Sequence, residues 1–280
     1  MIDNKLNSNI SNQISKNEIR KIQLEILTSV DIFCRKYDIK YSLYYGSLLG
    51  AIRHNGFIPW DDDIDIAMTR ENYNFFLEKF NKFNPKYEVI GPNENESFPF
   101  WFSKICDNDT LQMERIENKP YYFGISIDLF PLDYAPNMFR AFFKKIYFSY
   151  WKFLMLSKTV DLSLKRNFMK MVIIKLSFLF SKRKTAGLLC YKANKKISNK
   201  NKSKRIWCPL STYGHRDAFN ISVMQTYTYH IFEGEKFLIL KEYDKILKKI
   251  YGNYMVLPTE EKRISHHNFV CYYKKDMKNE

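Results

Sequence analysis

Four aspartates lie within five residues, directly after a Pro-Trp pair, in the stretch PWDDDID: Asp61, Asp62, Asp63 and Asp65. Residues 64–68 have the alternating pattern of a strand, and in a strand residues two apart share a face. Asp63 and Asp65 would therefore point together. Two neighbouring carboxylates repel each other unless a cation lies between them, and a hard divalent ion is the natural occupant. The spacing predicts a site for a hard divalent cation that could also bind phosphate oxygens.

The acidic cluster has a second interpretation as a solvated surface loop. A calcium-binding EF-hand fits less well, because a loop that starts at Asp61 places Ile66 where the sharp turn requires Gly. The pair Gly46-Ser47, a helix length upstream, favours the metal site. At the start of a helix its free N–H groups form a phosphate cradle, although an isolated Gly-Ser pair is more typical of a turn.

The stretch GSLLGAIRHNGFIPWDDDIDIAM resembles the signature of the LicD family. This family includes bacterial phosphocholine transferases, is related to the fukutin-related proteins and belongs to the nucleotidyltransferase superfamily. ISIDLFPLD (residues 125–133) and FEG…YDKILKKIYGNYMVLP (residues 232–258) are similar to further family blocks. Asn253 stands where the family usually has Asp, and residues 239–242 lack a proline that is common there. These departures concern the C-terminal substrate side.

The resemblance implies an α/β (α+β) fold, namely a DNA polymerase β-type nucleotidyltransferase core, here with a basic helical insertion. Asp63 and Asp65 would hold Mg²⁺ or Mn²⁺ against the donor diphosphate. Asp128 would be the third carboxylate and would accept the proton of the acceptor hydroxyl. Gly46 and Ser47 would bind phosphate, and Arg53 would offset its charge. Asp61 and Asp62 would shape the approach.

Asp128 lies between Ile127 and Leu129 in a strand-like run from residue 124 to 129. A carboxylate flanked by such residues should be buried and needs a partner. The implied fold supplies a metal as that partner. The alternative is a buried Asp that caps a turn at Pro131.

The activity implied by the resemblance is transfer of a phospho-substituted alcohol, most simply phosphocholine, from a CDP-linked donor to a sugar hydroxyl. The acceptor would be a cell-surface glycan precursor, of a kind that is often lipid-linked, and CMP would be released. Two alternatives stay open. The same fold could move the nucleotide itself, or the chain could be a catalytically silent, membrane-bound scaffold, against which the intact carboxylates argue.

Helix and strand signals surround these residues. The capping box at Ser15 predicts a helix that reaches Tyr37, and Thr69 caps a second helix. Strand-like runs cover residues 87–90, 100–106 and 110–116, and a helix ends at Gly252. Lys104 lies on one of these strands. Contact with a phosphate is one interpretation, and a solvent-exposed strand lysine is the more typical one.

Residues 139–205 differ from the rest of the chain. They contain 19 Lys and Arg against one Asp, whereas the whole chain has a net charge of +15, so the remainder is slightly acidic. The stretch is also rich in aromatic residues, including Phe148, Trp151 and Phe153. Such basic, amphipathic helices are typical of a membrane interface, and an anionic membrane surface is the predicted partner. A solvated helical subdomain is the alternative. Nucleic acid is not expected, because no recognised binding module accompanies the charge.

These observations predict three parts: a catalytic core over residues 1–137, the basic segment over 138–205, and a C-terminal part over 206–280 that completes the core. The start of the chain lacks a signal pattern, and five scattered cysteines indicate a reducing compartment. The predicted location is cytoplasmic, peripheral at the inner face of the cell membrane. His215, in a Tyr-Gly-His turn, is a further candidate for substrate contact.

Overall fold

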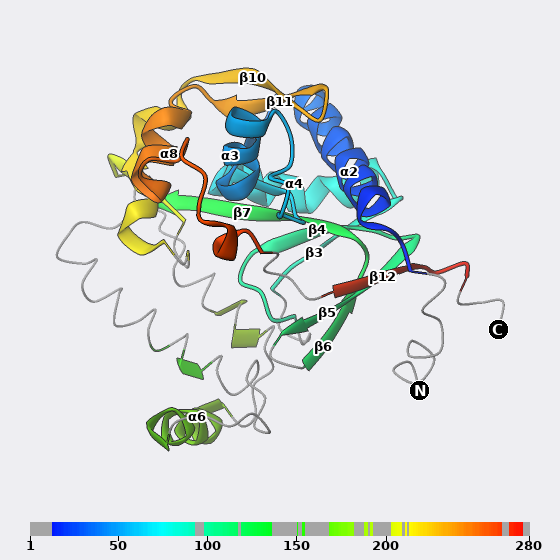
Figure 1. Cartoon of the computed structure of the whole chain (residues 1–280), viewed down its shortest axis with the longest axis vertical. Helices are drawn as coiled ribbons and strands as arrows, with labels where there is room; N and C mark the ends of the chain where they lie inside the picture. Colours follow the sequence, from blue (N-terminus) through cyan, green and yellow to red (C-terminus); the bar gives the residue numbers. More distant parts are fainter. Residues whose placement is uncertain are drawn as a thin grey trace.

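The computed structural model has a mixed α/β fold, with helices above a central sheet and a smaller sheet below it (Figure 1). It describes residues 13–92, 98–116, 119–135, 150, 153–154, 168–181, 188–189, 191–192, 203–208, 211, 213–264 and 269–276. Most of the basic segment, including Phe148 and Trp151, lies outside these residues, as does the side chain of His215.

The central sheet has seven strands among the described residues, in the order β1-β2-β7-β4-β3, and β8 and β9 extend it from β7. Its strands are β1 (Ser42–Leu43), β2 (Asp65–Thr69), β7 (Ser126–Tyr134), β4 (Ser103–Asp107), β3 (Tyr87–Ile90), β8 (Arg205–Trp207) and β9 (Ala218–Asn220). β2 and β7 are parallel, and the other pairs are antiparallel. The two strands that carry the predicted carboxylates are therefore neighbours with the same direction.

Two amphipathic helices, α2 (Lys16–Lys36) and α4 (Arg70–Phe83), cover one face of this sheet. Phe33 of α2 joins them, because its ring lies 5.1 Å from the ring of Phe76 and 5.4 Å from that of Phe80, both at steep angles. Both predicted caps are confirmed. Ser15 Oγ accepts the Glu18 N–H, and the hydroxyl of Thr69 accepts an N–H in the first turn of α4.

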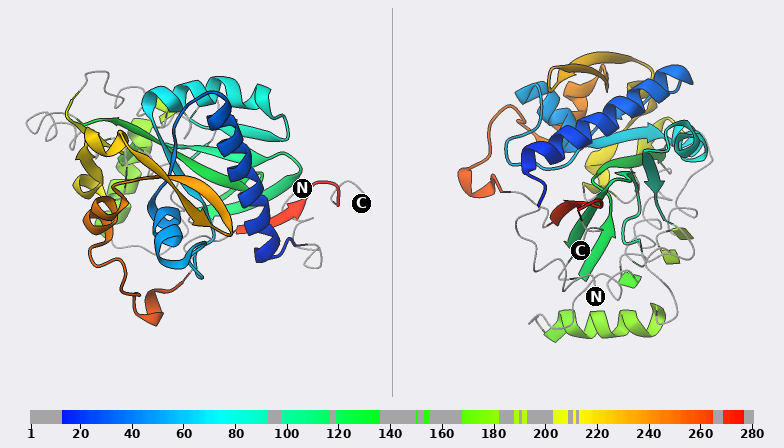
Figure 2. Two further views of the ribbon diagram at one scale, coloured as in Figure 1. Left: turned by 90° about the horizontal axis from the view of Figure 1, so that it is seen from above. Right: turned by 90° about the vertical axis from the view of Figure 1, so that its right-hand side faces the viewer.

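A second group of elements lies over the β1 edge: α3 (Tyr45–His54), the hairpin β10 (Tyr227–Phe232) and β11 (Glu235–Leu240), and α8 (Tyr243–Tyr251). Figure 2 shows the hairpin crossing between α2 and α3. Glu233 and Gly234 both have positive φ, as a two-residue hairpin turn of this twist requires. The Glu233 carboxylate accepts the Phe57 N–H at 2.9 Å, so the hairpin tip holds the loop after α3.

The smaller sheet has the order β12-β5-β6, with β12 (Phe269–Tyr273), β5 (Thr110–Ile116) and β6 (Lys119–Phe123). Short 3₁₀ turns are η2 (Gly214–Asp217), η3 (Ile221–Met224) and η4 (Glu260–Lys262). The helix α6 (Phe168–Ser181) lies at the edge of the molecule, apart from the central sheet (Figures 1 and 2). Within the described residues, none of the helices combines the length and apolar character needed to cross a bilayer.

Helix α3 begins at Tyr45, so Gly46 and Ser47 lie in its first turn, as predicted. Two other predictions about these elements are wrong in detail. Strand β2 begins at Asp65, so Asp63 lies in the loop before it. Strand β7 continues through Pro131 to Tyr134, which removes the turn that Asp128 was alternatively expected to cap. Proline has no N–H to donate, but Pro131 is paired only with Met68 of β2, because the pairing of β4 with β7 ends at Leu129. The sheet therefore tolerates a proline at this position.

Candidate active site

Three strands of the central sheet bring three charged residues into one row. Asp65 of β2 is paired with Asp128 of β7, and Asp128 is paired on its other side with Lys104 of β4. Directly paired residues on neighbouring strands point to the same face of a sheet. The opposite face belongs to α4, where the hydroxyl of Tyr73 lies 2.6 Å from that of Ser103. The charged row therefore lies on the face that α4 leaves open.

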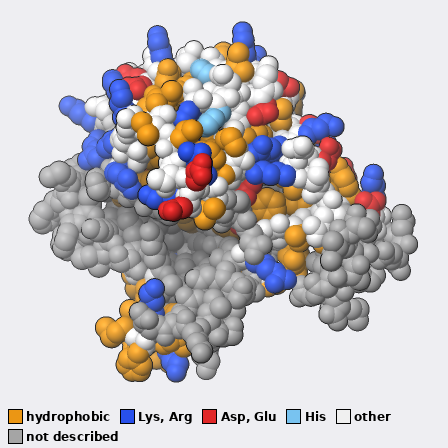
Figure 3. Space-filling view, in the orientation of Figure 1, with side chains coloured by type: hydrophobic (Ala, Val, Ile, Leu, Met, Phe, Trp, Pro, Cys, Tyr) orange, Lys and Arg blue, Asp and Glu red, His pale blue; other side chains and the backbone are white. Residues whose placement is uncertain are grey.

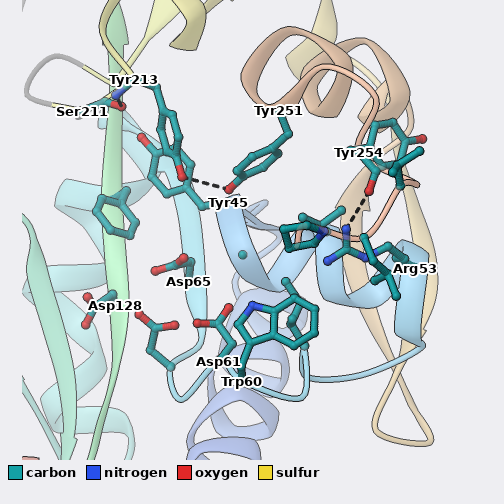
Figure 4. A pocket seen from close by; sticks show the side chains of 18 of the residues that line it. Tyr45, Arg53, Trp60, Asp61, Asp65, Asp128, Ser211, Tyr213, Tyr251 and Tyr254 are labelled. Carbon is teal, nitrogen blue, oxygen red and sulfur yellow. Dashed lines mark hydrogen bonds between the residues drawn. The ribbon is translucent and has the colours of Figure 1, made fainter. Parts of the chain in front are cut away.

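Asp63 joins this row from the loop that precedes β2. One carboxylate oxygen from each of Asp63, Asp65 and Asp128 lies within 4.8 Å of the other two. The loop is tied to β7, because the Asp128 N–H donates to the Ile64 carbonyl at 2.8 Å. Asp61 lies on the same side of the pocket (Figure 4). The structure thus brings together the three carboxylates that the sequence predicted, although only two of them are on strands.

The first turn of α3 supports the carboxylates from behind. Ser47 Oγ accepts the Asp65 N–H at 2.8 Å, and the Tyr44 N–H donates to the Asp65 carbonyl at 2.9 Å. Gly46 lines the pocket, and a Cβ at this position would lie 2.6 Å from a carboxylate oxygen of Asp61. Gly46 therefore allows Asp61 to approach the helix, whereas the buried Ser47 side chain fixes the backbone of Asp65.

Helix α2 holds the acidic loop through two residues that were not among the predicted site residues, Arg20 and Gln23. Arg20 donates to the Asp61 carbonyl at 2.8 Å, and also to the carbonyls of residues 58 and 59. Gln23 donates to the Asp62 carbonyl at 3.0 Å. The signal in the sequence was the placement of these polar residues beside Ile19 and Ile22, on the buried stripe of an amphipathic helix.

Lys104 is buried, so its interpretation as a solvent-exposed strand lysine is wrong. Its ammonium lies 2.7 Å from Asp128 and 3.9 Å from Glu114. It also lies 4.6 Å from the centre of the Phe100 ring. Burial alone would lower the pKa of Lys104, but the attraction of Asp128 and Glu114 outweighs it, and the pKa is raised. The contact that the structure shows for Lys104 is thus with a carboxylate.

Burial raises the pKa of Asp128 from 3.8 to about 6. The Lys104 ammonium opposes this shift, and the nearby Asp63 carboxylate adds to it. A buried carboxylate in this range gains or loses its proton close to neutral pH. Asp128 can therefore either bind a cation or exchange a proton with a ligand.

A pocket of about 1070 Å³ opens beside the carboxylates. Asp61, Asp63, Asp65 and Asp128 form one part of its wall. Tyrosines from three separate segments, at positions 45, 213 and 251, form a neighbouring part (Figure 4). These tyrosines could not be predicted from the sequence, because residues so far apart in the chain carry no local signal of a shared wall.

Arg53 lies farther along the pocket, beyond Trp60 (Figure 4). Its guanidinium donates to the Tyr254 carbonyl at 2.7 Å, and its Nε donates to His54 at 2.9 Å. The structure therefore places Arg53 in the same cavity as the carboxylates but not against them. Burial lowers the pKa of Arg53, which as a guanidinium stays charged at neutral pH.

Comparison with known proteins gives a family match in the same part of the chain. The family model described as the LicD/FKTN/FKRP nucleotidyltransferase domain matches residues 38–173. The lipopolysaccharide cholinephosphotransferase LicD of Haemophilus influenzae is 32% identical over 272 residues, which cover 91% of this chain and 97% of that protein. A protein of Rickettsia prowazekii is 33% identical over 97 residues, or 34% of this chain and 35% of its own length.

Proposed function

Because the chain belongs to the LicD family of phosphotransferases, we propose that it transfers phosphocholine from a CDP-linked donor to a sugar hydroxyl, releasing CMP. The similarity to a lipopolysaccharide cholinephosphotransferase over nearly the full length of both chains supports the head group and the glycan acceptor. The observation that carries the proposal is the group of three carboxylates, Asp63, Asp65 and Asp128, on the wall of a large open pocket.

The same carboxylates suit a hard divalent cation, and we propose Mg²⁺ or Mn²⁺. All three candidate ligands are oxygen atoms, which these ions prefer, and the three atoms are close enough to share one ion. The Lys104 ammonium offsets part of the negative charge, and a divalent cation would offset more of it. When bound, such an ion neutralises the charge of the donor diphosphate and orients it.

In the proposed reaction the acceptor oxygen forms a bond to the phosphorus atom that carries choline. The bond from that phosphorus to the bridging oxygen of CMP breaks, and CMP leaves with the electron pair. Asp128 is placed to take the proton of the acceptor hydroxyl, because its carboxylate lies on the pocket wall beside those of Asp63 and Asp65. Ser47 and Gly46 keep Asp65 and Asp61 in position.

The finer architecture and location are also part of this proposal. We assign the core to the DNA polymerase β type, which is supported by the two carboxylates on adjacent strands of a mixed sheet under a helix N-terminus. We place the protein at the inner membrane face, where a CDP-linked donor and a lipid-linked acceptor would meet. The exposed apolar side chains of α6 support this placement.

Incubation with a panel of CDP-linked alcohols, a lipopolysaccharide-type acceptor and Mg²⁺ or Mn²⁺ tests the proposal. CMP release that depends on the acceptor, favours CDP-choline and stops on chelation is the expected result. Release of pyrophosphate from a nucleoside triphosphate would instead indicate nucleotidyl transfer. A lack of turnover with every donor would favour the silent scaffold.

A further inference from the structure

We propose that Tyr45, Tyr213 and Tyr251 form a binding site for the quaternary ammonium group of the donor. This inference rests on the proposed function and adds to it the residues that select choline among other alcohols. A quaternary ammonium ion cannot donate hydrogen bonds and is weakly hydrated, so aromatic rings are its preferred partners in proteins. The site lies beside the carboxylates, above them in Figure 4, whereas Arg53 lies to the right of both.

The rings are arranged as adjoining walls. The Tyr213 ring centre lies 5.2 Å from that of Tyr45 and 5.5 Å from that of Tyr251, and the second pair is nearly perpendicular. Phe130 continues the wall, 5.1 Å from Tyr45 and again at a steep angle. All four residues line the pocket. Two of these three contacts are steep and the Tyr45–Tyr213 pair is tilted by 37°, so the rings face the pocket from different directions, as binding of a rounded cation requires.

The tyrosine hydroxyls are held by protein groups, which leaves the rings as the surface offered to a ligand. Tyr213 donates to the hydroxyl of Tyr251 at 3.2 Å. The hydroxyl of Tyr45 donates to the fully buried Asp217, which also accepts from Tyr44 at 2.7 Å. Tyr45 has a φ of 40°, which is unusual for a bulky residue. The fold therefore holds this ring in place against a backbone preference.

The charge around the rings favours a cation. Burial raises the pKa of Tyr213 and of Tyr251, and the nearby carboxylates of Asp65 and Asp61 raise both further. The same negative field stabilises a positive head group. Choline has only two carbons between its oxygen and its nitrogen, so a phosphate held at the carboxylates would leave the nitrogen beside the tyrosines.

The rings could alternatively stack on the cytosine base of the donor. The two ligands differ in their response to the head group, because a stacked base is common to CDP-choline and CDP-ethanolamine. Ethanolamine ends in a primary ammonium, which is more strongly hydrated and needs hydrogen-bond acceptors. A site for quaternary ammonium therefore separates the two donors, whereas a base-stacking site does not.

The test compares kcat/KM for CDP-choline and CDP-ethanolamine in wild type and in Tyr213→Leu, Tyr251→Leu and Tyr251→Phe. Each Leu variant should lower the preference for CDP-choline by about 5- to 30-fold. Most of this change should come from a lower kcat/KM for CDP-choline, with little change for CDP-ethanolamine. Tyr251→Phe keeps the ring and should stay within about threefold of wild type. Tyr229→Leu is the matched control: this half-exposed ring lies outside the pocket, with the Arg35 guanidinium 4.8 Å from its centre.

Inhibition by tetramethylammonium chloride provides a second measurement that does not depend on turnover of the poorer donor. It should exceed inhibition by ammonium chloride in wild type, and the excess should be lost in the Leu variants. Equal losses with both donors, or a wild type that uses both equally well, would overturn the inference while the phosphotransferase proposal stands. A wild type that turns over neither donor would overturn both.

Discussion

Asp128 lies between two partners of opposite charge, with Asp65 on one neighbouring strand and Lys104 on the other. This position explains why a carboxylate is tolerated in the middle of a buried strand. Lys104 supplies a charged hydrogen bond at 2.7 Å, and the open face of the sheet leaves the other side of the carboxylate to the pocket. Three predictions belong to this residue scale.

Substitution of any proposed metal ligand should remove most activity. Asp63→Asn, Asp65→Asn and Asp128→Asn should each lower CMP release by about 100-fold or more. The loss of one carboxylate weakens the binding of a cation that stabilises the transition state by several kcal/mol. The fold should persist in the Asp63 and Asp65 variants, since each change relieves repulsion within the cluster. Asp128→Asn also removes the ion-pair partner of the buried Lys104, so its turnover is expressed per folded protein. Asp62→Asn is the control and should be milder, because Asp62 is not on the pocket wall. Near-normal turnover of Asp128→Asn would contradict the three-carboxylate site.

Mg²⁺ binding should weaken as the pH falls through about 6. Burial raises the pKa of Asp128 to about 6, so below this pH the metal-free carboxyl holds a proton that Mg²⁺ must displace. The affinity should fall by about tenfold per pH unit on the acid side and level off above it. Trp60 and Trp101 line the pocket, so their fluorescence can report a Mg²⁺ titration. An affinity that is constant between acid and neutral pH would contradict this role of Asp128.

The raised pKa of Asp128 also determines how the stability of the metal-free protein changes with pH. A carboxyl whose folded pKa lies above its ordinary value of 3.8 binds its proton more tightly in the folded state. The contribution of Asp128 to the stability of the metal-free protein is therefore greatest below pH 3.8, and it declines as the pH rises to about 6.

Lys104→Met should destabilise the metal-free protein by about 3–5 kcal/mol, because it leaves the buried carboxylates of Asp128 and Glu114 without the ammonium. Added Mg²⁺ should narrow this gap, since the cation replaces part of the lost positive charge and stabilises the folded state by binding to it. Urea unfolding with and without Mg²⁺ measures both effects. Lys40→Met is the control, because the ion pair of Lys40 with Asp38 is exposed and screened by solvent, so its loss should change the stability far less. Equal stability of Lys104→Met and wild type would contradict the supporting role of Lys104.

At the scale of elements, α3 connects the acidic loop to the sheet. Its first turn contacts Asp61 and Asp65, and its middle contacts the loop that follows it. A Cβ at Gly50 would lie 2.4 Å from the carbonyl oxygen of Gly56. Helix and loop are therefore in backbone contact, and the loop cannot yield by rotating a side chain.

Gly50→Ala should destabilise the protein by about 1–3 kcal/mol, although Gly to Ala inside a helix normally stabilises by about 1 kcal/mol. The clash should also displace the loop that leads to Asp61, so CMP release should fall more than the loss of folded protein explains. Thermal unfolding and turnover of the remaining folded enzyme separate the two effects. A variant as stable as wild type would show that the loop has room to move.

At the scale of the whole molecule, the proposed chemistry and the basic charge lie in different parts of the chain. Residues 139–205 carry the excess of Lys and Arg, whereas the carboxylates lie in the central sheet. Helix α6 belongs to the basic stretch and exposes Phe168, Leu179 and Phe180 beside Lys170 and Lys175. Figure 3 shows hydrophobic and basic side chains side by side at the lower left, where α6 lies.

Binding to anionic liposomes should accordingly be strong and only partly reversed by salt. Each Lys or Arg near the surface contributes about 1 kcal/mol that salt weakens, whereas apolar burial persists. Replacing Phe168 and Leu179 together by Ser should lower affinity by about tenfold or more. Ile32→Ser, an exposed apolar residue of α2, is the control. Liposome flotation at low and high salt measures the difference.

A protein that does not bind liposomes but binds duplex nucleic acid at low salt, and releases it at high salt, would contradict the membrane assignment.

Local patterns were sufficient for the parts of the site that lie close together in the sequence. The spacing of Asp63 and Asp65 indicated a shared side, and the apolar neighbours of Asp128 indicated a buried carboxylate that needs a partner. The caps at Ser15 and Thr69 marked the starts of α2 and α4, because a cap contacts N–H groups only two or three residues away. Such interactions are encoded within a few residues and can be predicted without the fold.

The other parts of the site depend on contacts between distant segments. Lys104 contacts Asp128 only because β4 and β7 pair in one register, and a shift by one residue would turn it to the other face. The tyrosine wall requires residues 45, 213 and 251 to meet, and Arg20 reaches the acidic loop across 41 residues of chain. Register and packing are set by the burial of the whole core, so these partners were decided by the tertiary structure alone.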